Sequence, residues 1–191
     1  TAFGPTKVLF EFSDADDADF GNVLAAPEIA KLRVGPATGS PAVYKYFVVV
    51  SGYNNKRTAV NGHAGGDTNV SSDTLNKRVL FLLSLDHVLN TPWVAGTDYY
   101  KFTFPANTVG SPNGLGPVSL LPSRSGDRST AAMYFGDLQG NLWRLNTAGN
   151  DPSTWIPAPV TVAAPLPIFV ATDSCSHWQP STPRPALPSR A

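Results

Sequence analysis

The sequence is short of cysteine, of net charge and of long apolar runs, and each shortage excludes a class of protein. Cys175 is the single cysteine among 191 residues, which excludes an internal disulfide and a cysteine-rich metal site. Fourteen Lys and Arg balance fourteen Asp and Glu, which argues against a nucleic-acid partner and against a basic membrane-surface helix. The apolar stretches 46–50 and 79–85 are far shorter than the roughly 20 residues that a membrane-spanning helix needs.

Signatures of catalysis and of export are also missing. The sequence has no G-x-S-x-G elbow and no G-x-x-x-x-G-K-[ST] loop, so we expect no enzymatic activity. His63, His87 and His177 have none of the usual metal-site spacings, and we expect them at the surface or in loops. No signal segment opens the chain, and its start at Thr1 rather than at Met predicts a fragment or a processed product.

Glycine and proline are abundant, at sixteen and eighteen residues, which indicates short strands joined by many turns. Runs that are rich in Val, Phe, Tyr and Leu and bounded by turn residues predict strands. These runs are 7–12, 44–51, 79–85, 99–104, 132–136 and 141–146. Residues 25–32 and 118–121 are predicted to form two further short strands.

A strand–turn–strand unit occurs twice, as FVVVSGYNN followed by RVLFLLSLD and as AMYFGDLQG followed by NLWRLNT. Each unit is typical of the middle pair of a propeller blade. We therefore predict an all-β chain, a partial β-propeller of about two four-stranded antiparallel blades. The predicted domain is 1–172, with a closing strand at 7–12 and blades at about 24–104 and 115–162. Because a propeller ring needs more than two blades, either the chain is cut from a longer protein, whose missing blades are then its partners, or its sheet edges are covered by something else.

The last segment, 173–191, departs from this pattern. It is rich in Pro and Ser, and from residue 174 onward it contains no Val, Ile, Phe or Gly, so it cannot form a central strand. Two explanations remain open. The tail is either a disordered linker or the product of a frameshift near residue 174 that truncates a longer gene product.

The segment Tyr134–Asn146 (YFGDLQGNLWRLN) resembles the blade signature of the PilC/PilY family of type IV pilus biogenesis proteins. Further segments are similar to that family in the same order, so that the resemblance covers about 7–172. These segments are 11–12, 20–21, 27–32, 48–55, 80–86 and 113–118. The resemblance implies a β-propeller without catalytic activity, at the outer membrane, at the cell surface or in the periplasm, and associated with pili.

The same resemblance implies a role in pilus assembly or as an adhesin at the pilus tip. The implied partners are pilin or minor pilin subunits and a host-surface receptor or glycan. Two alternatives remain open. Quinoprotein-like dehydrogenase propellers share the Y-x-G-D-x-x-G-x-L-W pattern, and a standalone glycan-binding β module would also suit strands with exposed aromatic residues.

The resemblance also implies an acidic calcium loop just before the signature, and this chain departs from it. The loop's acidic positions are occupied here by Ser123, Ser125, Asp127 and Ala131, so that only Asp127 keeps a carboxylate. Because calcium usually needs several carboxylate ligands, we expect this degenerate loop to bind no calcium and the chain to carry no cofactor.

A second acidic cluster consists of Asp14, Asp16, Asp17 and Asp19. Alternating acids in a turn are typical of a calcium loop, but no Gly or distal Glu completes an EF-hand pattern. The alternative is a solvated turn between blades.

The polar insertion 54–77 is the predicted binding loop, because long loops on β scaffolds often carry binding residues. Its candidate contact residues are Asn54, Asn55, Asn61, Asp67 and Asn69. The alternative for this segment is a loop without fixed structure. Trp93 is predicted to be exposed and able to stack on a sugar ring, whereas Trp143 lies in a predicted strand and is expected in the core between blades.

Overall fold

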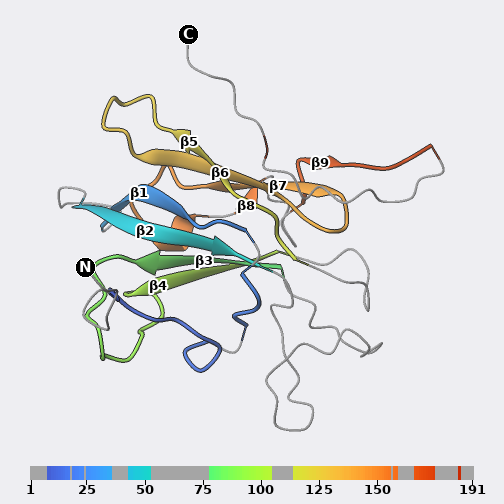
Figure 1. Cartoon of the computed structure of the whole chain (residues 1–191). Helices are drawn as coiled ribbons and strands as arrows, with labels where there is room; N and C mark the ends of the chain where they lie inside the picture. The colour runs from blue at the N-terminus through green and yellow to red at the C-terminus, as the bar shows by residue number, and fades with distance from the viewer. Residues whose placement is uncertain are drawn as a thin grey trace, which may run out of the picture.

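A computed structural model describes the strands and part of the segments that connect them. The described residues are 8–17, 19–23, 25–35, 43–52, 78–104, 114–155, 157–158, 166–174 and 185. Within them the secondary structure is two antiparallel sheets and one short 3₁₀ turn, with no α-helix (Figure 1). No helix in these ranges has the length and apolarity needed to cross a membrane.

The first sheet contains four strands in the order of the chain, each antiparallel to its neighbours. The strands are β1 (Glu28–Val34), β2 (Val43–Ser51), β3 (Arg78–Ser84) and β4 (Tyr99–Phe104). All seven residues of β3 are buried, because both faces of this strand are covered. The strand predicted near 25–32 is confirmed as β1, which begins one residue after Pro27.

The second sheet follows the same order. Its strands are β5 (Ser119–Pro122), β6 (Thr130–Gly136), β7 (Asn141–Asn146) and β8 (Pro157–Ala158), and β9 (Phe169–Val170) also pairs with β7. The β6–β7 hairpin turns at 137–140, where Gly140 has φ of 80°, a value that favours glycine. The register places Phe135 opposite Trp143 and Met133 opposite Leu145.

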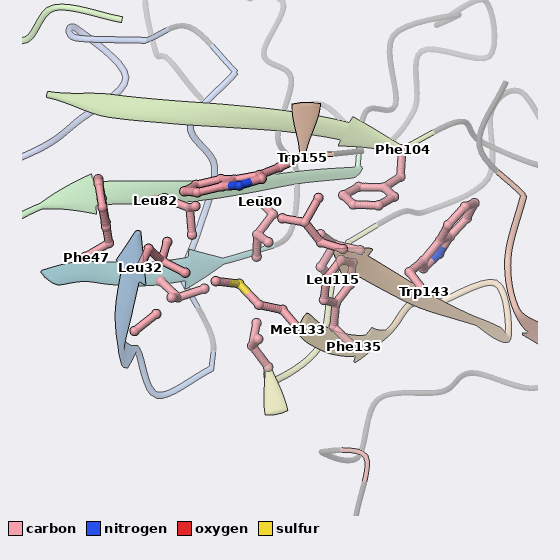
Figure 2. Close-up of a cluster of buried hydrophobic side chains, with 14 residues drawn as sticks. Leu32, Phe47, Leu80, Leu82, Phe104, Leu115, Met133, Phe135, Trp143 and Trp155 are labelled. Atoms are coloured by element: carbon pink, nitrogen blue, oxygen red, sulfur yellow. The ribbon is translucent and has the colours of Figure 1, made fainter. Parts of the chain in front are cut away.

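The two sheets pack face to face around a shared core (Figures 1 and 2). Because side chains alternate between the faces of a strand, every second residue of the facing strands points into this core. The first sheet contributes Leu32, Phe47, Leu80, Leu82 and Phe104, the second sheet contributes Met133, Phe135 and Trp143, and the segments beside the second sheet contribute Leu115 and Trp155. Trp143 is fully buried there, which confirms its predicted place between the blades.

The opposite face of the first sheet is covered by the N-terminal segment rather than by another strand (Figure 1). Phe10 and Phe12 pack there with Phe20 and Trp93 against Phe81 and Tyr99. The predicted strand at 7–12 is therefore wrong for the described residues 8–12, which pair with no strand. The alternation of aromatic residues is typical of a strand. The same alternation also allows the rings to pack when a segment lies across the face of a sheet without pairing with it.

Candidate functional site

The turn of the blade signature is organised around the buried carboxylate of Asp137. This side chain accepts hydrogen bonds from the backbone N–H of Gln139 at 2.8 Å and of Asn141 at 2.9 Å. The indole Nε1–H of Trp143 donates to its other oxygen at 2.7 Å. The Asp, Gly, Asn and Trp of the signature thus form one hydrogen-bonded unit that closes the β6–β7 hairpin and fixes the core tryptophan.

Arg78, the first residue of β3, reaches this unit from the first sheet. Its Nε lies 2.8 Å from Oδ2 of Asp137, and both side chains are fully buried. Its guanidinium also donates to Oε1 of Gln139 and lies 5.4 Å from the centroid of the Trp143 ring. Burial lowers the pKa of Arg78, and the charge of Asp137 opposes this shift. A buried ion pair therefore joins the two sheets, and we call it the Arg78–Asp137 pair.

The degenerate loop before β6 closes on itself through hydroxyl groups. The Oγ atoms of Ser123 and Ser125 lie 2.8 Å apart. Oδ1 of Asp127 accepts hydrogen bonds from the backbone N–H of Ser129 at 2.8 Å and from its hydroxyl at 2.7 Å. These two bonds, the hydroxyl bond being the larger cause, hold the pKa of Asp127 well below its usual range.

Two side chains of the first sheet also hold this loop. The Tyr44 hydroxyl donates to Oδ2 of Asp127 at 2.8 Å, and Nζ of Lys31 donates to the backbone oxygen of the same residue at 2.8 Å. Lys31 also lies 4.5 Å from the centroid of the Tyr44 ring. Both carboxylate oxygens of Asp127 are thus engaged by protein donors. We call this set of contacts the Asp127 clasp.

The N-terminal acidic cluster is divided between two arrangements. Nζ of Lys101 on β4 donates to carboxylate oxygens of Asp17 and Asp19 at 2.9 Å each, and the Tyr99 hydroxyl donates to Asp17 at 2.9 Å. Asp16 turns back to accept the backbone N–H of Ser13 at 2.8 Å. Burial alone would lower the pKa of Lys101, but its hydrogen bonds to Asp17 and Asp19 raise it overall.

The structure therefore differs from a solvated turn, because Asp19 is buried and Asp17 carries an ion pair with Lys101. In the described part of the chain no three or more His, Cys, Asp or Glu side chains gather as a metal site. Asp14 has a partner of its own within the fold.

Trp93 is less exposed than predicted, and His87 lies in a loop but is not at the surface. The two rings stack with centroids 3.6 Å apart, and Nε1 of Trp93 donates to the backbone oxygen of Glu11 at 2.8 Å. His87 is buried and Trp93 is half-buried. The loop positions were predicted correctly, but the rings are used to anchor the N-terminal segment.

The predicted binding residues Asn54, Asn55, Asn61, Asp67 and Asn69 all lie outside the described residues, as does all of the tail after residue 174 except Pro185. Three basic residues of these sites were not predicted from the sequence, namely Lys31, Arg78 and Lys101. Each lies in or beside a predicted strand, where a single basic residue gives no signal of its partner.

Comparisons with known proteins test the resemblance to the PilC/PilY family. No family model matches the chain. The chain is 30% identical over 184 residues to a type IV pilus biogenesis factor PilY1 homolog of Xylella fastidiosa, and 29% identical over 203 aligned residues to PilY1 of Pseudomonas aeruginosa. The resemblance to the PilC/PilY family is confirmed. The matches cover 95% and 96% of this chain, which spans 11% and 14% of those two PilY1 proteins.

The fold has a solved counterpart in the crystal structure of the C-terminal domain of Pseudomonas aeruginosa PilY1. The TM-score is 0.62 at 24% sequence identity, and the match covers 94% of this chain and 32% of that chain. The prediction of an all-β partial propeller with two antiparallel blades is thus confirmed. The blade signature, on which the resemblance to the PilC/PilY family was first based, supplies Asp137, the acidic partner in the Arg78–Asp137 pair.

Proposed function

We propose that this chain supplies two adjacent propeller blades to a type IV pilus biogenesis factor and acts by binding. The observation that carries the proposal is the match to two PilY1 proteins over nearly the whole chain. The Arg78–Asp137 pair supports it, because a buried ion pair between the sheets suits a rigid scaffold that presents loops to partners. The residues 1–172 are proposed as the propeller part, and 173–191 as a separate tail.

The partners that suit this role are pilin or minor pilin subunits, and the location is the cell surface or the periplasm in association with pili. A host receptor or glycan is the partner for an adhesin role at the pilus tip. Both PilY1 relatives are named as pilus biogenesis factors rather than as dehydrogenases, which supports binding over the quinoprotein alternative.

Deletion of the encoding gene in its source strain tests the proposal. The number of surface pili per cell is counted by electron microscopy, and adhesion per pilus is measured on the same cultures. Loss of pili that the wild-type gene restores supports a role in assembly. Normal pili with reduced adhesion support the adhesin role alone. Unchanged pili and unchanged adhesion overturn both.

We further propose that neither acidic loop requires calcium, because Lys31 and Lys101 already bring ammonium groups to them. An excess of chelator is expected to leave the melting temperature of the chain unchanged, as is millimolar calcium. A rise in melting temperature with calcium, measured by differential scanning fluorimetry, would contradict this expectation.

A further inference from the structure

A groove of about 740 Å³ lies beside β4, the last strand of the first sheet. Four consecutive residues of β4 line it, from Tyr99 to Phe102. Its other wall is the connection after β7, where Asp151 precedes the 3₁₀ turn η2 (Pro152–Thr154) and Trp155 follows it.

The groove runs along the edge of β4. Tyr100 and Phe102 point to the core side, where their rings lie 6.0 and 6.4 Å from that of Trp155. Tyr99 and Lys101 point to the opposite side, where both contact Asp17. Because neighbouring residues of a strand face opposite ways, only the space beside the strand's edge contacts all four.

The backbone at this edge offers unpaired hydrogen-bonding groups. The backbone oxygen of Asp98 accepts from Ser84 at the start of the β3–β4 ladder, so that alternate residues from 98 onward bond to β3. The residues between them direct their N–H and C=O groups outward, as Tyr99 does toward Gly96. In the described ranges the outward groups of Lys101 and Thr103 meet no backbone partner. An exposed strand edge of this kind is a template for another strand.

The charge and the rings of the groove restrict what fits it. Asp17, which lines the groove, and Asp19 both pair with Lys101, so that two negative charges face one positive charge. Oδ1 of Asp151 accepts hydrogen bonds from the backbone N–H and the hydroxyl of Ser153, and these bonds lower the pKa of Asp151. The groove therefore has aromatic rings on both walls, and it carries the negative charges of Asp151 on one wall and of Asp17, beside Lys101, on the other.

We propose that the edge of β4 binds an extended peptide segment of a partner protein, which adds as a further strand. An apolar side chain of the peptide would pack against Tyr100, Phe102 and Trp155, and a basic side chain would lie near Asp151. Backbone pairing gives affinity in this mode, and the alternate side chains give specificity. The inference goes beyond the proposed pilus function, since it is argued from β4 and the connection after β7.

The test uses the full chain and a synthetic peptide probe. The probe is an acetylated and amidated octapeptide in which valine alternates with threonine, with one central valine replaced by arginine. Its matched control carries N-methyl groups on alternate backbone amides, which removes the pairing donors and changes no side chain. Binding is measured by fluorescence anisotropy, and the contact is located by shifts of the Lys101 and Thr103 amide signals in nitrogen-15 NMR spectra.

Variants of the chain separate pairing from nonspecific contact. Thr103→Pro removes an outward N–H while leaving the ladder to β3 intact, and Thr103→Val keeps that N–H. We expect Thr103→Pro to weaken binding at least tenfold and Thr103→Val less than twofold. Asp151→Asn retains the capping oxygen, and its loss of charge is expected to weaken binding of the arginine peptide about threefold at low salt.

Equal binding of the N-methylated peptide would overturn the proposal even if a variant failed to fold. Binding without shifts at Lys101 and Thr103 would also overturn it, as would no binding at millimolar probe. Chitotriose serves as the glycan probe, and shifts at the groove caused by chitotriose but not by the peptide would replace strand addition with sugar binding. None of these outcomes depends on whether the chain acts in pilus biogenesis.

Discussion

At the scale of single residues, basic side chains of the first sheet hold aspartate-containing turns of the neighbouring segments. Arg78 holds Asp137, Lys31 holds the loop at Asp127, and Lys101 holds the N-terminal acids. The aspartates are visible in the sequence, as a signature or as a cluster. Their partners lie dozens of positions away and are not visible, because the fold alone brings them together.

The Arg78–Asp137 pair gives the first prediction. Asp137→Asn leaves the guanidinium of Arg78 buried without its counter-charge, and removing one partner of a buried pair typically costs about 3–5 kcal/mol. The free energy of unfolding, measured by urea denaturation, is expected to fall by about this amount. Asp86→Asn is the control, because Asp86 is exposed and such surface ion pairs contribute less than about 1 kcal/mol. Equal effects of the two substitutions would contradict the role of the pair.

The Asp127 clasp predicts a dependence on pH. The folded pKa of Asp127 lies below the usual 3.8, so its contribution to stability is present above pH 3.8 and is lost as pH falls toward the folded pKa. The difference in melting temperature between wild type and Asp127→Asn is therefore expected to be constant near neutral pH and to shrink below pH 3.8. Tyr44→Phe, which removes one donor, is expected to show a smaller difference of the same shape. A difference that does not vary with pH would contradict the clasp.

At the scale of elements, strand positions were largely predictable and the segments that cover them were not. Period-two patterns and turn residues located the strands from β1 to β7, because those patterns report burial on one face or both. The segment 8–12 has the same period but lies across a sheet face, where Phe10 and Phe12 fill space around Trp93. The period-two pattern alone does not distinguish an edge strand from a segment that lies across the face of a sheet without pairing.

The packing of the segment 8–12 across the first sheet gives a prediction at this scale. Phe12 contacts the rings of Phe20, Phe81 and Tyr99, so Phe12→Ala is expected to lower the free energy of unfolding by about 3 kcal/mol. Leu9→Ala in the same segment is the control and is expected to change it little, since Leu9 is 70% exposed. Chemical denaturation measures both. A similar small loss for the two substitutions would show that the segment does not cover the sheet in solution.

At the scale of the whole molecule, the chain is two blades that share one core, and it spans a small part of its PilY1 relatives. The repeated strand–turn–strand unit predicted the number of blades. It did not predict that the signature joins the second blade to the first through Arg78, because β3 and the β6–β7 turn are separated by more than fifty residues. Two blades are thus the smallest unit that contains both the signature turn and Arg78, its buried partner.

The number of surface pili in a strain with a single substitution tests the central claim, that this blade pair is a working part of a pilus biogenesis factor. Asp137→Asn is introduced into the intact chromosomal gene, with Asp86→Asn as the matched strain, and protein level and protease resistance are followed in both. We predict that the Asp137→Asn strain loses surface pili or pilus-dependent adhesion while the Asp86→Asn strain keeps them. Wild-type pili and adhesion in cells whose blade pair has become protease-sensitive would contradict the account.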